Sequence, residues 1–313
     1  MPDQPLIILC PGQGAQHVGM GKGWASLSNE AAKIYRHADE VLGPVLGLDL
    51  SKVCFEGPEE TLNGTDIAQA AIYVTSIACL RGLEEQGKIS LDNPQAVAGL
   101  SLGEYTALHL AGVFDFADGL QLVAQRGRFM QEAAAENESG MVALIGADEA
   151  QARELCEAAS AGEVLVPANF NCPGQIVISG TSAACARALE EASRMGLRAT
   201  ALTVAGAFHS PLMQSAAERM EDALSRVPFE SPRTTVLSNV TGEPHGSDGD
   251  EIKRLLVRQI TEPVRWEQNV RWLTANAPAP GPGRYIEPAP GKVLSGLMRR
   301  IDKSMKVENH AEP

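Results

Sequence analysis

Aromatic residues are scarce in this chain of 313 residues, at 4%, whereas 44% of the residues are hydrophobic. The hydrophobic content is enough for one large domain, or for a large domain that carries a smaller one. Glycine, with 30 residues, and alanine are abundant. Because small side chains let helices pack closely on a sheet, this composition favours an α/β fold.

The cysteines lack the CxxC and CxxH spacings that are typical of zinc sites and disulfide frameworks. We therefore expect buried structural thiols at six positions: Cys10, Cys54, Cys79, Cys156, Cys172 and Cys185. The chain also contains no HExxH motif and no clustered carboxylates. The sequence therefore predicts no metal site.

No apolar run approaches the roughly 20 residues that a membrane helix needs. The N-terminal segment, 1–10, has no basic stretch before an apolar one and no cleavage-site pattern. A net charge of −13 disfavours binding to nucleic acid and to anionic membranes. We expect a cytoplasmic protein that binds neither nucleic acid nor a membrane.

A glycine-rich loop spans residues 12–23 but lacks the Gly-Lys-Ser/Thr ending of a P-loop. It also departs from GxGxxG, because His17 stands where the last glycine would be. The sequence therefore does not support a nucleotide cofactor. Exposed backbone N–H groups in such a loop could instead form half of an oxyanion hole.

Hydrophobic periodicity predicts a parallel sheet with helices packed around it. Strands are expected at 6–10, 96–98, 234–237 and 284–286, and helices at 30–42, 66–85, 104–111, 117–135, 211–226, 249–259, 266–276 and 291–303. The segment from 140 to 204 has a different order, with strands at 141–145, 164–166, 175–179 and 197–204 and helices at 148–159 and 181–195. This βαββαβ order predicts a ferredoxin-like insert.

The sequence Gly99-Leu100-Ser101-Leu102-Gly103 fits the Gly-x-Ser-x-Gly pattern of a nucleophile elbow. A predicted strand precedes it and a predicted helix follows it, as a serine exposed on a sharp turn requires. The motif alone is weak, and an ordinary glycine-flanked turn between strand and helix remains open at this point.

A nucleophilic serine needs a base, and His209 is the favoured one of six histidines. It stands between the apolar segment 202–208 and Ser210-Pro211, where a strand leads into a helix. Open α/β sheets place their chemistry at such strand ends. A core histidine remains the alternative, and we expect His245, in a turn-rich stretch, to be solvated.

Five segments then occur in order along the chain: PGQGAQHVGMG (11–21), GLSLGEYTAL (99–108), QRGRFMQEA (125–133), GAFHSPLM (206–213) and LVRQITEPVRW (256–266). Together they resemble the bacterial-type malonyl-CoA:acyl carrier protein transacylases and the related acyltransferase domains of fatty-acid and polyketide synthases. The resemblance implies an α/β-hydrolase-like catalytic domain formed by residues 1–136 and 206–313. It also implies a ferredoxin-like subdomain over residues 137–205.

The resemblance also implies catalytic roles. Ser101 is the nucleophile and His209 its base, while the main-chain carbonyl of Gln259 replaces the acid of a full triad. The N–H groups of Gln13 and Leu102 are expected to bind the oxyanion. The second of these follows the nucleophile directly, as elbow geometry requires.

Specificity is expected to come from Arg126, whose guanidinium can hold a malonyl carboxylate by two hydrogen bonds. Phe208 resembles the bulky residue of malonyl-selective members, and Met130 and Asn169 match positions that line the acyl pocket. Most members have histidine at the position of Leu100. Because leucine cannot hydrogen-bond the carboxylate, Arg126 would carry more of the recognition.

The resemblance implies a monomeric enzyme that moves the malonyl group of malonyl-CoA to the phosphopantetheine thiol of acyl carrier protein, without a bound cofactor, for fatty-acid biosynthesis. The alternatives are a discrete acyltransferase of a polyketide or malonate-decarboxylase system, a serine hydrolase or thioesterase, and a non-catalytic carrier-binding module. Because carrier proteins are acidic, docking is expected to use the basic residues of the last helix, between 292 and 306.

Overall fold

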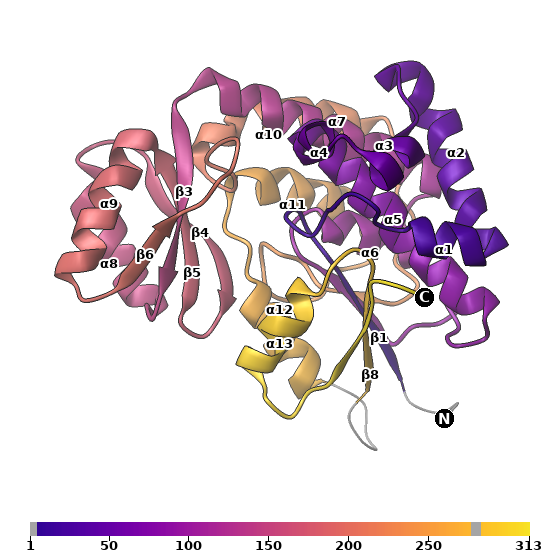
Figure 1. The fold of residues 1–313 in the computed structure, drawn as a ribbon. Coiled ribbons are helices and arrows are strands. Elements are labelled where there is room, and N and C mark those ends of the chain that lie inside the picture. Colours follow the sequence, from indigo (N-terminus) through magenta and orange to yellow (C-terminus); the bar gives the residue numbers. More distant parts are fainter. Residues whose placement is uncertain (1–4, 277–282) are drawn as a thin grey trace.

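A computed structural model describes residues 5–276 and 283–313, which form two sheets with helices around them (Figure 1). The larger sheet has five parallel strands in the order β7-β2-β1-β8-β9. Its strands are β1 (Leu6–Cys10), β2 (Ala96–Gly99), β7 (Thr235–Val236), β8 (Arg284–Pro288) and β9 (Val307–His310). The chain is therefore an α/β protein, as its composition predicted.

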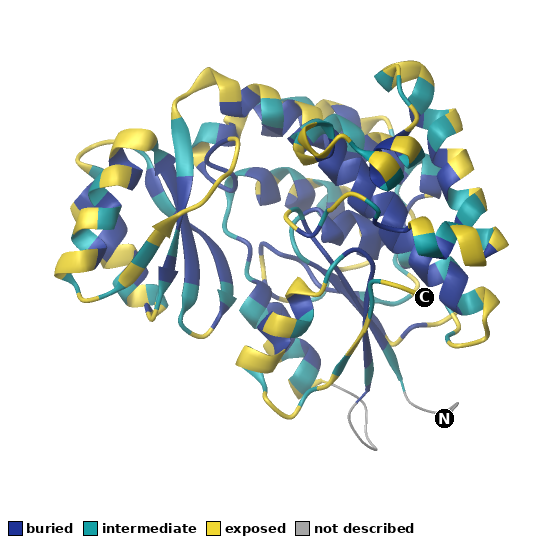
Figure 2. Cartoon of the chain, in the orientation of Figure 1, coloured by how far each residue is buried: buried dark blue, intermediate teal, exposed yellow. Residues whose placement is uncertain are grey.

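Alternate residues of β1 face two separate hydrophobic cores. Ile8 and Cys10 belong to the largest core cluster, whereas Ile7 and Leu9 belong to the cluster on the other face of the sheet. Helices thus cover both faces of the sheet, as is usual for parallel sheets. Figure 2 shows the buried residues concentrated in this sheet and the helices next to it.

Different helices cover the two cores. The helices of the larger core include α2 (Asn29–Leu46), α5 (Thr65–Glu85), α6 (Gly103–Leu110), α7 (Phe116–Glu136), α10 (Gln214–Ser225) and α11 (Gly249–Thr261). Those of the second are α12 (Trp266–Ala275) and α13 (Val293–Ile301). None of the helices in the described ranges has the length and hydropathy of a membrane span.

The second sheet has four antiparallel strands in the order β4-β5-β3-β6. Its elements follow the order βαββαβ that the sequence predicted: β3 (Ser139–Ile145), α8 (Glu149–Ser160), β4 (Leu165–Cys172), β5 (Gln175–Thr181), α9 (Ser182–Arg194) and β6 (Arg198–Ala201). It has its own hydrophobic cluster, which α8 and α9 cover. The ferredoxin-like arrangement is therefore confirmed.

Several element boundaries differ from the prediction. β4 extends to Cys172 through two register shifts at Pro167 and Phe170, which interrupt its apolar pattern. β6 ends at Ala201 rather than at 204. The helix predicted at 211–226 begins as the 3₁₀ helix η1 (Pro211–Met213) and continues as α10. Four elements were not predicted, because their segments are short and polar or mixed: α1 (Lys22–Leu27), α3 (Leu50–Glu56), α4 (Glu59–Asn63) and β9.

Candidate active site

A sharp turn between β2 and α6 presents Ser101 at the carboxyl end of the parallel sheet. Ser101 has a φ of 53°, in the left-handed region that residues other than glycine rarely adopt. A Cβ atom at Gly99 would lie 1.9 Å from the carbonyl carbon of Gly103, and one at Gly103 would lie 2.2 Å from the carbonyl oxygen of Cys10. Larger side chains cannot fit at either glycine, so the turn has the strand–turn–helix geometry expected from the motif.

The imidazole of His209 lies within hydrogen-bond distance of this serine. The distance from Ser101 Oγ to His209 Nε2 is 2.8 Å, and His209 Nδ1 lies 2.6 Å from the main-chain oxygen of Gln259 on α11. Because a carbonyl oxygen only accepts, Nδ1 carries the proton and Nε2 offers its lone pair to the serine hydroxyl. The structure thus brings together the three residues that the sequence selected as serine, base and orienting carbonyl.

The backbone around His209 is held by the small sheet. His209 has a φ of 57°, so it shares the left-handed conformation of Ser101. Ser179 Oγ on β5 donates to the carbonyl oxygen of Phe208 at 2.6 Å, and the N–H of Ala207 donates to Ser139 Oγ on β3 at 3.1 Å. These bonds fix the segment before His209 and therefore the direction of its ring.

Burial keeps His209 neutral. Loss of hydration first, and the nearby positive charge of Arg126 second, lower the pKa of His209 from 6.5 to about 3, although the bond to the Gln259 carbonyl raises it. The imidazole is therefore unprotonated at neutral pH. It is in the state that can accept a proton from Ser101.

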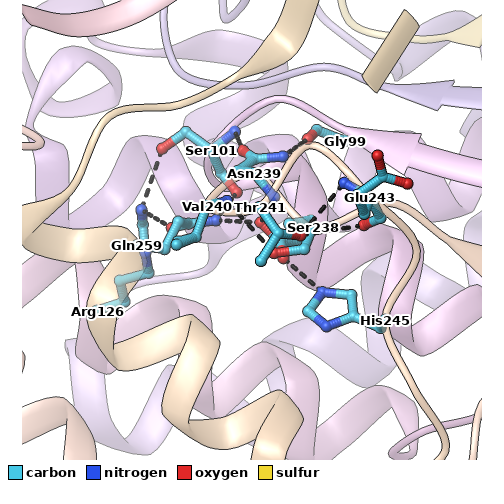
Figure 3. A network of polar contacts seen from close by, with 11 residues as sticks. Gly99, Ser101, Arg126, Ser238, Asn239, Val240, Thr241, Glu243, His245 and Gln259 are labelled. Carbon is cyan, nitrogen blue, oxygen red and sulfur yellow. Dashed lines mark hydrogen bonds and ion pairs between the residues drawn. The ribbon is translucent and has the colours of Figure 1, made fainter. Parts of the chain in front are cut away.

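The guanidinium of Arg126, on α7, is 1% exposed and lies against the same serine. Nη1 donates to Gln69 Oε1 at 2.6 Å, and Nη2 donates to Ser101 Oγ at 3.0 Å and to Gln259 Oε1 at 2.8 Å. Figure 3 shows Arg126 reaching toward Ser101 beside Gln259. The inward orientation that the sequence suggested for Arg126 is therefore present.

All three acceptors around Arg126 are neutral oxygen atoms, and its Nε is buried with no partner among the described residues. Burial lowers the pKa of Arg126 from its ordinary value. The buried carboxylate of Glu104 acts in the opposite direction and raises this pKa, but it makes no hydrogen bond to the guanidinium. Burial of a cation is costly, and an anion that enters the site and bonds to it directly recovers part of that free energy. The arrangement therefore favours a small anionic group next to the serine hydroxyl.

Two backbone N–H groups near Ser101 are free to bind an oxyanion. Within residues 5–276 and 283–313, no acceptor lies within hydrogen-bond range of the N–H of Gln13 or of Leu102. Leu102 precedes α6 directly, where the first N–H groups of a helix have no intrahelical partner. Gln13 follows Gly12, where a Cβ atom would lie 2.4 Å from the carbonyl oxygen of Leu100. The glycine therefore lets the two segments approach closely.

Comparison with known proteins identifies the family of the chain. The model of the acyl transferase domain matches residues 7–309. The chain belongs to the acyl transferase family. It is 39% identical over 309 residues to the malonyl CoA-acyl carrier protein transacylase of Escherichia coli K12, covering 98% of this chain and 96% of that protein. The Bacillus subtilis protein of the same name is 38% identical over 310 residues, covering 98% of this chain and 94% of that protein.

Solved structures of this acyl transferase family have the same fold. The malonyl CoA-acyl carrier protein transacylase of Clostridium perfringens has a TM-score of 0.91 at 39% identity, covering 99% of this chain and 94% of that one. A malonyl-transacylase solved in complex with a type II PKS acyl-carrier protein has a TM-score of 0.91 at 35% identity, covering 99% of this chain and 96% of that one. The resemblance that the sequence motifs suggested is confirmed.

Four further residues were predicted to line the acyl pocket of this acyl transferase, and the structure shows the contacts of each. Met130 is connected to Arg126 through Gln69, whose Nε2 donates to Met130 Sδ at 3.6 Å. Phe208 directly precedes His209 and is buried in the larger core. Asn169 on β4 bridges to Val264, and Leu100 packs against the second core. Leu100 also directly precedes Ser101. The pocket-lining roles of these four residues remain predictions.

The prediction for His245 is wrong. Its side chain is fully buried, and Nε2 lies 2.6 Å from Glu104 Oε1. The turn-rich sequence around it suggested solvent, but the turn folds back onto α6. Sequence reasoning also missed Gln69, Glu104 and Asn239, which surround Ser101 and Arg126. Glu104 stands one residue after the Gly-x-Ser-x-Gly motif, and this position is the signal that could have identified it.

Proposed function

We propose that the chain transfers a malonyl group from malonyl-CoA to the phosphopantetheine thiol of acyl carrier protein, through an ester on Ser101. The observation that carries the proposal is the buried guanidinium of Arg126, 3.0 Å from the serine hydroxyl and surrounded by neutral acceptors. A malonyl thioester places a carboxylate two bonds from the reacting carbonyl carbon. The names of the related proteins describe the same reaction.

In the first step, His209 Nε2 removes the proton of Ser101 Oγ, which attacks the thioester carbonyl carbon. The negative charge that develops on the carbonyl oxygen is bound by the N–H groups of Gln13 and Leu102. The tetrahedral intermediate collapses, the carbon–sulfur bond breaks, and His209 returns the proton to the leaving thiolate. In the second step the thiol of the carrier protein attacks the seryl ester by the same path in reverse.

Arg126 contributes by holding the malonyl carboxylate while the serine reacts. When the ester forms, Ser101 Oγ becomes a weaker acceptor, and the malonyl carboxylate is the stronger partner for the N–H groups of Arg126. With two N–H groups facing one carboxylate, the acyl group has one orientation, and water has less access to the ester. Removing Arg126 should cost about 2–5 kcal/mol of malonyl binding.

The proposal is tested by incubating the wild-type protein with malonyl-CoA, with and without acyl carrier protein, and measuring protein masses. We expect a malonyl adduct on the wild type, its transfer to the carrier, and no adduct on Ser101→Ala. The matched control is Ser225→Ala, on the exposed surface of α10, which should load like the wild type. A malonyl adduct on Ser101→Ala, or release of free malonate in place of malonyl carrier protein, would sink the proposal.

A further inference from the structure

Glu104 is a fully buried carboxylate on the first turn of α6, behind the reacting serine. Its two oxygen atoms have separate partners. Oε1 lies 2.6 Å from His245 Nε2, while Oε2 accepts from Gln259 Nε2 at 2.7 Å and from the N–H of Asn239 at 3.1 Å. Glu104 takes no part in the bond-making and bond-breaking steps described above. Each of the two partners of Oε2, however, contacts a residue of the site.

The side chain of Gln259 connects Glu104 to Arg126. Its Nε2 donates to Glu104 and, at 2.9 Å, to the carbonyl oxygen of Ser101, while its Oε1 accepts from Arg126 Nη2. The chemistry of the neighbours fixes this orientation, because a carboxylate can only accept and a guanidinium can only donate. If the amide turned over, its NH₂ group would face the guanidinium, donor against donor.

Asn239 connects Glu104 to the elbow itself. Its Oδ1 accepts from the N–H of Ser101 at 2.6 Å, and its Nδ2 donates to the carbonyl oxygen of Gly99 at 2.7 Å. These bonds hold the left-handed turn from inside the protein (Figure 3). The Asn239 branch supports the serine, which every acyl substrate needs. The Gln259 branch also contacts Ser101, but it alone reaches Arg126, the group that binds a carboxylate.

His245 holds the other side of the carboxylate. The main-chain N–H of His245 donates to the carbonyl oxygen of Val236 on β7 at 2.8 Å. This bond connects the turn after β7 to the parallel sheet. With Oε1 bonded to His245, Glu104 keeps Oε2 directed at Gln259 and Asn239. Beside the bonds from Arg126 to Gln69 and Ser101, one side of the guanidinium is thus held through a chain of side chains that runs from His245 through Glu104 and Gln259.

We propose that Glu104 is a positioning residue for malonyl recognition: the acceptor oxygen that it presents to Gln259 sets the orientation of Arg126. This inference rests on the function proposed above. The Gln259 amide is oriented by an acceptor at Oε2, and a neutral oxygen can fill that place. A glutamine at this position could present its carbonyl oxygen to Gln259 and its NH₂ group to His245, whose other tautomer offers a lone pair at Nε2.

The test compares kcat/KM for loading of Ser101 from malonyl-CoA with that from acetyl-CoA, which lacks the carboxylate. We expect Glu104→Met to lower the malonyl-to-acetyl ratio by about 10-fold, mainly through the malonyl KM, because a misplaced clamp loses binding. Glu104→Gln should stay within about 3-fold of the wild-type ratio. In an Arg126→Ala background, Glu104→Met should leave the ratio unchanged, because the residue it positions is gone.

Glu287→Met is the matched control. Glu287 is equally buried, but its oxygen atoms accept from the N–H groups of Leu294 and Ser295 at the start of α13, and it contacts none of the residues above. It should lower thermal stability and keep the malonyl-to-acetyl ratio. If Glu104→Met does not fold, Gln259→Met removes the mediating amide and should lower the same ratio.

An unchanged ratio in Glu104→Met or Gln259→Met would overturn the proposal, as would a Glu104→Gln variant as impaired as Glu104→Met. Failure of the function itself gives a different result. In that case the wild-type protein would not load malonyl at all, and no ratio could be measured.

Discussion

At the scale of single residues, the charge of Arg126 affects the protonation of its neighbour His209. Arg126 is a buried cation, and its charge helps to keep His209 unprotonated. A neutral imidazole can accept a proton from Ser101, and a cationic guanidinium can bind a carboxylate. The positive charge of Arg126 therefore has two effects: it keeps His209 neutral, and it binds the carboxylate of the substrate.

The lowered pKa of His209 predicts the pH dependence of malonyl loading. Because protonation of His209 removes the base only near its pKa of about 3, kcat/KM should stay level between pH 8 and pH 5. A histidine with the ordinary pKa of about 6.5 would instead lose half of the activity near that pH. The measurement is the loading rate by quenched-flow mass spectrometry, with melting curves to confirm the fold at each pH. An inflection between pH 6 and pH 7 would contradict the prediction.

At the scale of elements, α13 begins next to the glycine loop near the site and ends at the protein surface. It begins just after Gly291, where a Cβ atom would lie 3.2 Å from Cβ of Ala15 in the glycine loop. Near its end, Arg300 Nη1 donates to Gln175 Oε1 on β5 at 2.9 Å. Exposed cations lie on α13 and in the residues directly before and after it, in an otherwise acidic protein: Lys292, Arg299, Arg300, Lys303 and Lys306.

We expect this basic surface to receive the acidic carrier protein. Charge reversal by Arg299→Glu and Arg300→Glu should raise the KM for carrier protein about 10-fold at low salt, less at high salt, and leave the KM for malonyl-CoA unchanged. The control is Arg153→Glu with Arg194→Glu, on α8 and α9, which should alter neither KM. A carrier KM that stays at the wild-type value would remove α13 from the docking surface.

Much of the fold could be predicted from the sequence because its periodic segments are long. α5, α7 and the βαββαβ order follow directly from apolar spacing. β9 could not be predicted, because its residues VENH are polar and it pairs only along the edge of β8. It is held by long-range contacts, such as the bond from Trp24 Nε1 to the carbonyl oxygen of His310.

The site could be predicted only in part, for a similar reason. The motifs identify the groups that react, Ser101 and His209, and the cation at Arg126. The residues that orient them, Asn239 and His245, are distant in sequence and belong to no motif that we distinguished. Their positions depend on tertiary structure, which brings the turn after β7 beneath α6.

At the scale of the whole molecule, two packed units share the site. The small sheet has a separate hydrophobic cluster, and it also supplies Ser139 and Ser179, which hold the His209 segment. Asn169 on β4 adds a bridge to Val264 of the larger part. We propose that residues 137–205 form a subdomain that can lose its structure while residues 1–136 and 206–313 keep theirs.

Thiol labelling tests this division, because all six cysteines are free and buried. Burial also raises the pKa of Cys54, Cys79 and Cys156 to about 12, so the native protein should react slowly. In increasing urea, pulsed alkylation should modify Cys156 and Cys185, which lie in the small cluster, before Cys54 and Cys79. Labelling of all four in one transition would show that the two units unfold together.

The burial of Arg126 among neutral acceptors has a consequence for the evolution and engineering of this protein. Burying this guanidinium lowers the stability of the substrate-free protein. An apolar residue of similar volume at this position should therefore raise the free energy of unfolding and abolish malonyl binding. A screen that rewards heat resistance alone would therefore select against the side chain that distinguishes the substrate. Ligands with a carboxylate that binds Arg126 should stabilise the folded protein. The fraction of folded protein should therefore rise with the concentration of its substrate.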